Sequence, residues 1–184
     1  VKYIASFKQP EQIKAFASWI NYKTLLIAGV GMVIALIISP VLISFLNLST
    51  PALGYSLAPL LFSFVIIMTW RSILQGLHKF NIFAASLSLE AILKLVFFGM
   101  FLLMGWQVLG AVGAMLLSVI AAGIFTYFSL RSYLQNPTKI SPDIEGFFKY
   151  SLIALLQGLA LTAMYSTDLL LVKHYLNAEQ AGVY

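Results

Sequence analysis

The longest run without a charged side chain reaches from Thr24 to Trp70, and it constrains the fold more than any other feature. A helix that crosses a bilayer needs about 20 consecutive apolar residues. The run is long enough for two such helices, and its only interruption is the polar segment 47–51. We therefore predict two membrane-spanning helices joined by a short turn, at Thr24–Leu46 and Ser56–Leu77.

Two further charge-free runs cover Leu95–Leu130, with a break at Gly105, and Tyr150–Thr167. Both runs are apolar on every face, whereas barrel strands alternate polar and apolar residues. In lipid, a helix satisfies its backbone groups within the segment. The chain is therefore predicted to be an all-α, polytopic transmembrane helical bundle with five spans. The last three are expected from near Asn81 to the break, from the break to about Tyr133, and over Ile144–Val172.

The composition excludes several classes of protein. Hydrophobic residues make up 61% of the chain and charged residues 9%, and the mean hydropathy is +0.94. Soluble domains carry about 25% charged residues, so a soluble enzyme, a disordered segment and a nucleic-acid-binding module are excluded despite the net charge of +5. The chain has no cysteine, which excludes disulfides and thiol nucleophiles. We expect neither a metal nor a cofactor.

The basic residues predict the orientation in the membrane. Nine of the eleven Lys and Arg residues lie in the segments that the five spans place at one membrane face. The opposite face has only Lys173, and Lys94 lies within a span. Loops rich in Lys and Arg stay in the cytoplasm, so the face with most of the basic residues is predicted to be cytoplasmic and Thr50 to be outside. The residues on the cytoplasmic face are Lys2, Lys8, Lys14, Lys23, Arg71, Lys79, Arg131, Lys139 and Lys149.

Several local patterns predict finer detail. Gln9–Phe16 is predicted to be a short interfacial helix, and Pro59 is placed in the first turn of the second span. Pro40, deep in the first span, is a candidate hinge, although packing can also satisfy the carbonyl that it frees. A ridge of small residues on the fourth span is predicted to pack closely against another helix. It consists of Gly110, Ala114, Ser118 and Ala122.

Two charges in the third span form the strongest functional candidate. At the helical rise, Glu90 lies about 14 Å and Lys94 about 20 Å from Asn81, near the middle of a hydrocarbon core about 30 Å thick. Charges at such depth are costly and normally face a bundle interior or a watery cavity. Either Lys94 holds a phosphate-bearing substrate in a central cavity, or the two residues form a buried structural pair, for which their spacing is favourable.

Asp168 is the third intramembrane charge, near the outer end of the fifth span. It is expected at the outer mouth of a cavity, and the alternative is that it caps the helix end or pairs with Lys173. Asp143 and Glu145 are the only close acidic pair outside the bilayer, and they suit the start of a helix, which favours acidic residues. There is no glycine-rich phosphate loop. We therefore expect that the chain is not an enzyme.

Two motifs resemble a known family. Residues 71–80, Arg-Ser-Ile-Leu-Gln-Gly-Leu-His-Lys-Phe, closely resemble the cytoplasmic turn between the fourth and fifth helices of bacterial polysaccharide flippases. These are the O-antigen and exopolysaccharide translocases of the multidrug/oligosaccharidyl-lipid/polysaccharide exporter superfamily. Residues 165–175 look like their seventh helix, and residues 179–184 resemble the turn that follows.

The resemblance implies an internal piece of a two-lobe exporter, with helices three to seven of twelve or more. Residues 1–139 would form the C-terminal part of the N-terminal lobe, as an interfacial helix and four spans. Residues 140–184 would hold the end of the linker, which covers Gln135–Ser141, and the first helix of the C-terminal lobe.

The function implied is translocation of a lipid-linked oligosaccharide, a polysaccharide or O-antigen precursor, across the bacterial cytoplasmic (inner) membrane by alternating access. Membrane lipids are the other expected partners, with H⁺ or Na⁺ as a coupling ion and no nucleic acid. The substrate-binding candidates are Lys94, Glu90, Asp168 and Arg71. Two alternatives stay open: a cation-coupled multidrug exporter of the same superfamily, and a structural membrane subunit that transports nothing.

Overall fold

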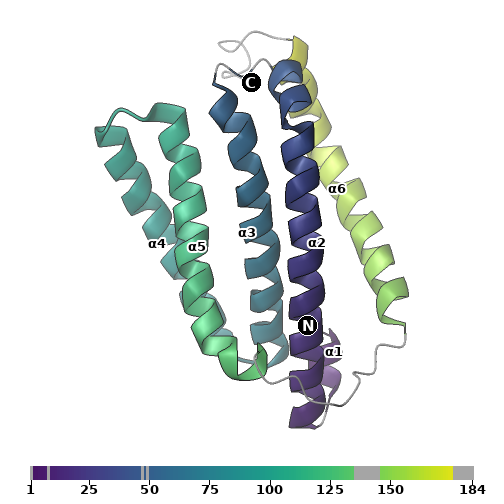
Figure 1. Ribbon diagram of the computed structural model, residues 1–184. Helices are drawn as coiled ribbons and strands as arrows, with labels where there is room; N and C mark the ends of the chain where they lie inside the picture. Colours follow the sequence, from purple (N-terminus) through teal and green to yellow (C-terminus); the bar gives the residue numbers. More distant parts are fainter. Residues whose placement is uncertain (1, 8, 47, 49, 135–145, 176–184) are drawn as a thin grey trace.

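The computed structural model describes residues 2–7, 9–46, 48, 50–134 and 146–175, and within these residues it contains helices and no strand. Long helices run side by side, and one short helix lies at the lower end of the bundle (Figure 1). The expected all-α polytopic bundle is confirmed. The helices are α1 (Lys2–Ser6), α2 (Pro10–Phe45), α3 (Pro51–Gly76), α4 (Phe80–Leu103), α5 (Gln107–Leu134) and α6 (Phe147–Tyr175).

Among the described residues, four helices, α2 to α5, are long and apolar enough to cross a membrane. Their outward faces carry large hydrophobic side chains such as Ile37 and Leu95, which are 71% and 73% exposed. An apolar surface of this extent is unfavourable in water and suits the hydrocarbon of a bilayer. The chain is a multi-pass membrane protein.

α2 is a single helix of 36 residues. The prediction of a separate interfacial helix at Gln9–Phe16 is wrong, because this segment forms the first turns of α2. Pro10 occupies the first helical position, where the missing N–H is tolerated. At the helical rise α2 is about 54 Å long, whereas the hydrocarbon core is about 30 Å thick. One end of α2 therefore extends beyond the hydrocarbon.

α3 begins at Pro51, earlier than the predicted Ser56. The preceding Thr50 has an extended backbone, and a proline suits the first helical position. Pro59 therefore lies more than two turns inside the helix, and its predicted place in the first turn is wrong. Hydropathy does not mark this start, because the first turns of the helix contain Gly54, Tyr55 and Ser56 and are less apolar than the rest of the span.

The helices α3, α4 and α5 are joined by short turns. The break predicted at Gly105 is confirmed, since α4 ends at Leu103 and Gly105 has a left-handed backbone with φ of 78°. In the other turn, which joins α3 to α4, the Lys79 ammonium stands 4.8 Å from the ring centroid of Tyr133. This cation–π contact ties the end of α5 to the α3–α4 turn.

α4 packs mainly on α5, α2 packs mainly on α3, and a contact between α3 and α5 joins the two pairs. The ridge of small residues lies in this packing, because Gly110, Ala114, Ser118 and Ala122 are all buried. A Cβ atom on Gly110 would stand 2.7 Å from the Cβ of Phe101 on α4. The predicted close packing of the ridge is confirmed.

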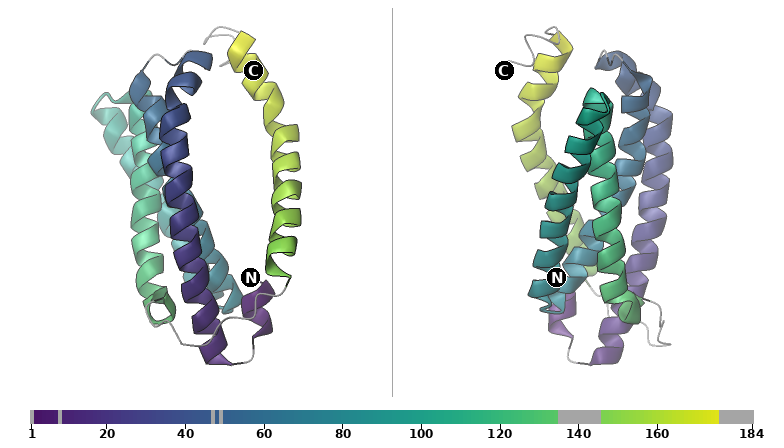
Figure 2. Two further views of the ribbon diagram at one scale, coloured as in Figure 1. Left: turned by 45° about the vertical axis from the view of Figure 1, so that its right-hand side comes forward. Right: turned by 90° about the vertical axis from the view of Figure 1, so that its left-hand side faces the viewer.

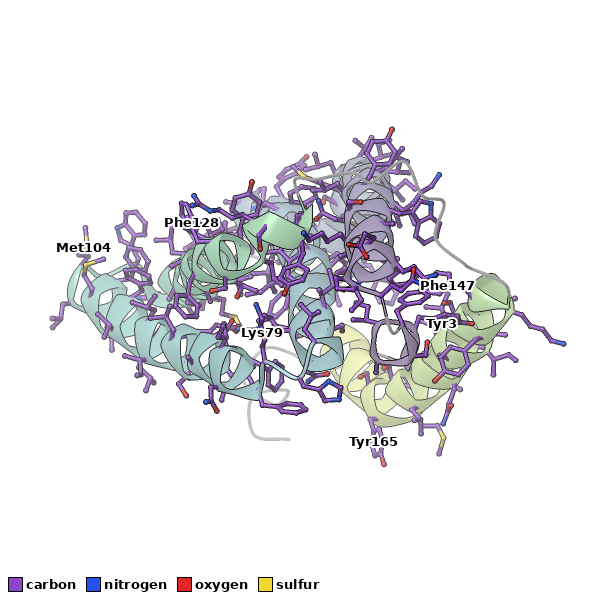
Figure 3. All side chains as sticks on the ribbon, turned by 90° about the horizontal axis from the view of Figure 1, so that it is seen from below. Tyr3, Lys79, Met104, Phe128, Phe147 and Tyr165 are labelled. Carbon is purple, nitrogen blue, oxygen red and sulfur yellow. The ribbon has the colours of Figure 1, made fainter. Side chains whose placement is uncertain are left out.

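α6 contacts the other helices near its first turn. The ring of Phe147 meets those of Tyr3 and Phe16 edge-on, at centroid distances of 5.3 and 5.7 Å. All side chains from Leu152 to Tyr165 are exposed. The helix stands away from α2 along most of its length (Figure 2), and Figure 3 shows Tyr3 and Phe147 close together while Tyr165 points outward.

α6 corresponds to the fifth expected span, Ile144–Val172. The helix is present, but it is not one of the four that are long and apolar enough to cross a membrane on the described residues, so its membrane crossing stays a prediction. The expected helix start with Asp143 and Glu145, and the linker at Gln135–Ser141, lie outside the described residues.

Candidate functional site: a buried charge network

Glu90 and Lys94 lie one turn apart on α4 and form an ion pair, as their spacing predicts. The Lys94 Nζ donates a hydrogen bond of 3.2 Å to Glu90 Oε1. The Glu90 side chain is 10% exposed, whereas that of Lys94 is 35% exposed. The Glu90 side chain is therefore largely enclosed by protein, while the Lys94 side chain remains partly exposed.

Arg71 brings a third charge to this pair from α3. Its Nη1 stands 2.7 Å from Glu90 Oε2, and its side chain is 3% exposed. Arg71 was expected at the cytoplasmic face, but the structure places it inside α3, more than one turn before the helix ends at Gly76. This basic residue is therefore part of the helix packing, and it does not support the orientation that was inferred from the loops.

Ser86 on α4 receives the other contacts of the Arg71 guanidinium. Nε donates to the Ser86 hydroxyl at 3.1 Å, and Nη2 donates to the Ser86 carbonyl oxygen at 2.9 Å. The flat guanidinium makes these contacts together with the ion pair to Glu90, a geometry that a lysine cannot reproduce. One side chain thus links α3 to two successive turns of α4.

A chain of hydroxyl groups extends the network to α5. The oxygens of Ser86 and Thr126 are 2.8 Å apart, and Thr126 donates to the carbonyl oxygen of Ala122, also at 2.8 Å. A hydroxyl has one proton to donate. Since Thr126 donates to Ala122, Ser86 donates to Thr126 and in turn accepts from Arg71. The hydrogen bonds run in one direction, from α3 through α4 to α5.

The two oxygens of Glu90 differ in their surroundings. Oε1 accepts the hydrogen bond of Lys94. Oε2 is buried and has the short ion-pair contact with Arg71, but it accepts no hydrogen bond from the described residues. The guanidinium is turned toward Ser86, so its N–H groups are not aimed at Oε2. The attraction between Arg71 and Glu90 is therefore one between charges in a poorly hydrated environment, where it is strong.

The network carries two cations and one carboxylate, so its net charge is +1. Burying charge is tolerated when it is paired and hydrogen-bonded, and these conditions hold for Arg71 and Glu90. Lys94 is the most exposed of the three charged side chains. The arrangement can hold an anion at Lys94, and it offers no activated nucleophile for a covalent reaction.

Asp168 is the remaining candidate substrate-binding residue. It lies in the second half of α6, and its side chain is outside the described residues. The structure brings Arg71, Glu90 and Lys94 together, while the expected role of Asp168 at a cavity mouth stays a prediction.

Ser86 and Thr126 were missed, although the sequence holds a signal for each. Ser86, Glu90 and Lys94 recur every four residues, which places them on one face of α4. Thr126 continues the spacing of the small-residue ridge by one more turn after Ala122. A polar stripe on one helix and a small-residue ridge ending in threonine on the next predict a polar contact between them.

An open groove of about 500 Å³ lies on another side of the bundle, between α3 and α5. Its lining includes Phe62, Ile66, Trp70, Gly123 and Tyr127 and is almost entirely apolar. Such a surface suits hydrocarbon and offers little to a phosphate or a sugar. The polar part of a substrate is therefore better matched by the charge network than by this groove.

No group of three His, Asp or Glu side chains that could hold a metal ion occurs among the described residues.

The family models, the curated proteins and the solved structures contain no match to the chain.

Proposed function

We propose that the chain is part of a flippase that moves a lipid-linked oligosaccharide across the bacterial cytoplasmic membrane by alternating access. The resemblance of residues 71–80 and 165–175 to polysaccharide flippases supports the proposal. The cargo would be a precursor of a surface polysaccharide or O-antigen. Its phosphate groups and glycan need polar surroundings during the crossing, since the hydrocarbon core solvates neither.

The observation that carries the proposal is the uncompensated charge at Lys94. Arg71 and Glu90 balance each other inside the bundle, and Lys94 adds a cation that is 35% exposed. A positive charge within a membrane span is costly unless it serves a polar partner or a watery path. A phosphate group is such a partner, because it accepts charge-assisted hydrogen bonds from an ammonium. In this proposal Lys94 holds the phosphate-bearing head of the substrate.

A structural subunit is the second candidate, and the hydrogen-bond chain favours it. The contacts from Arg71 through Ser86 to Thr126 hold three helices together, which needs no substrate. A cation-coupled multidrug exporter has less support, since it would use free acidic side chains for Na⁺, H⁺ or cationic drugs. Glu90 is instead engaged by two basic side chains.

Reconstitution of the full-length protein separates the three functions. Proteoliposomes would carry a fluorescent lipid-linked oligosaccharide, and translocation would be followed as its loss of accessibility to an added glycosidase. We expect translocation by the wild type and its loss in Lys94→Met. Lys149→Met makes the same change at an exposed lysine in the first turn of α6, and it should transport normally.

The same vesicles would also be tested with a cationic dye under an imposed Na⁺ or H⁺ gradient. Gradient-driven dye transport without oligosaccharide translocation would contradict the flippase and establish the drug exporter. Transport of neither compound by a well-folded wild-type protein would contradict both and leave the structural subunit.

A further inference from the structure

Arg71 is the most deeply buried charge of the network and has no open path to a ligand. Its side chain is 3% exposed, and its guanidinium donates hydrogen bonds to Ser86 and forms an ion pair with Glu90. We infer that Arg71 is a positioning residue: it compensates the charge of Glu90 and thereby leaves the Lys94 ammonium available to an anion. The inference rests on the proposed role of Lys94.

The argument starts from the position of Glu90 between two cations. Its Oε2 stands 2.7 Å from Arg71 Nη1, and its Oε1 stands 3.2 Å from Lys94 Nζ. One carboxylate can compensate only one positive charge. An uncompensated charge is least tolerable where burial is deepest, and Arg71 is the more buried cation. Glu90 therefore compensates mainly the charge of Arg71, and the positive charge of Lys94 stays largely available to a ligand.

The contacts with Ser86 fix this assignment in space. The Ser86 hydroxyl and carbonyl oxygens hold the guanidinium at two of its nitrogens. Arg71 therefore keeps its place beside Glu90 when Lys94 binds or releases a ligand. When an anion replaces Glu90 Oε1 as the acceptor of the Lys94 hydrogen bond, Glu90 is still paired with Arg71, which is the nearer of its two cations.

Removing Arg71 alone should change the competition at Lys94. Glu90 would then have Lys94 as its only cation within the network, and an incoming anion would have to displace a carboxylate that depends on Lys94. Removing Arg71 and Glu90 together should restore the original net charge, with Lys94 free. A purely structural role for Arg71 predicts the opposite order, because the double variant loses more of the contacts that hold α3 to α4.

The test is a calorimetric titration of the purified full-length protein with inorganic diphosphate. We expect binding by the wild type that is lost in Lys94→Met. Coulomb attraction across a few ångströms in a medium of intermediate dielectric predicts that Arg71→Gln weakens diphosphate binding by about tenfold or more. Arg71→Gln/Glu90→Gln should bind nearly as the wild type does. Arg131→Gln, at an exposed position near the end of α5, is the matched control and should bind unchanged.

Wild-type binding in Arg71→Gln would overturn the inference, and so would a double variant that binds as weakly as that single variant. Wild-type binding in Lys94→Met is a different result, since it removes the proposed role of Lys94 itself. If Arg71→Gln does not fold, the double variant is compared with the same variant carrying Lys94→Met. Strong binding in the first and none in the second supports the inference, whereas equally weak binding in both overturns it.

Discussion

Arg71 Nη1 and Glu90 Oε2 meet at 2.7 Å across the contact between α3 and α4. The contact changes how Glu90 and Lys94 are understood, because the two residues are not an isolated pair. Replacing both by neutral residues would leave Arg71 buried without its counter-charge. That experiment would therefore report the cost of an orphaned guanidinium together with any loss of function.

The burial of Arg71 gives a first prediction about stability. Glu90→Gln should lower the free energy of unfolding by about 3–5 kcal/mol, the usual cost of leaving one partner of a buried ion pair uncompensated. Lys94→Met should cost less than about 1 kcal/mol, because partly exposed ion pairs contribute little. Thermal unfolding in detergent measures both. Equal losses in the two variants would contradict the assignment of Glu90 to Arg71.

The hydroxyl chain gives a second prediction. Thr126→Val keeps the side-chain shape but removes the group that accepts from Ser86. It should cost about 0.6 kcal/mol, the average for hydrogen bonds between membrane helices, and at most about 1.7 kcal/mol. Thr167→Val on α6 is the matched control, because Thr167 is exposed and bonds only within its own helix in the described contacts. Its unfolding temperature should stay at the wild-type value. If the two variants have the same unfolding temperature, the hydrogen bond between Ser86 and Thr126 does not stabilise the contact of α4 with α5.

The close approach of α2 and α3 gives a third prediction. A Cβ atom on the buried Gly54 would overlap the side chain of Ile43 on α2, so Gly54→Ala should destabilise the protein by about 1–3 kcal/mol through overpacking. The double variant Gly54→Ala/Ile43→Ala should recover part of that loss, since the second change removes the overlapping atoms. A double variant whose loss equals the sum of the two single losses would show that the two side chains do not meet.

Much of the fold could be predicted because lipid imposes a simple rule on sequence. Charge-free runs identified α2, α3 and α5, and the apolar segment from Asn81 to the glycine at position 105 identified α4 despite its two charges. The helix starts were less certain. α2 begins at Pro10 and α3 at Pro51, in both cases before the predicted span, so hydropathy alone does not mark the start.

The site was predicted in part, for a related reason. Glu90 and Lys94 are neighbours on one helix, and their spacing alone predicts the pair. The contact with Arg71 depends on how α3 and α4 pack. Arg71 and Ser86 lie equally far from the turn at His78–Lys79, so antiparallel helices place them at one depth. Which face of α3 meets which face of α4 depends on tertiary packing, and this packing cannot be read from the sequence directly.

The aromatic contacts of α6 give a fourth prediction. Phe147→Ala should loosen the start of α6 from α1 and α2, since each aromatic pair contributes about 0.5–1.5 kcal/mol beyond the area that it buries. Hydrogen exchange of the backbone amides in α1 and the first turns of α6 should accelerate. Tyr165→Ala, at a residue that is 78% exposed, should leave the exchange of these amides unchanged. Identical exchange in the two variants would contradict the attachment.

The asymmetry of the basic residues gives a fifth prediction. The chain has no cysteine, so single cysteines can be labelled without background. In intact cells, an impermeant maleimide should react with a cysteine at position 50 and not with one at position 79, because Lys-rich loops remain in the cytoplasm. Labelling at position 79 without labelling at position 50 would reverse the topology.

The most direct test of the central claim is the rate of lipid-linked oligosaccharide translocation in two variants of the network. Arg71→Gln/Glu90→Gln removes the compensated pair and keeps Lys94, whereas the triple variant also carries Lys94→Met and has no charge left to pair. We predict that the double variant translocates at close to the wild-type rate and that the triple variant, at equal stability, does not translocate. Equal translocation by the two variants would contradict the claim that Lys94 binds the substrate.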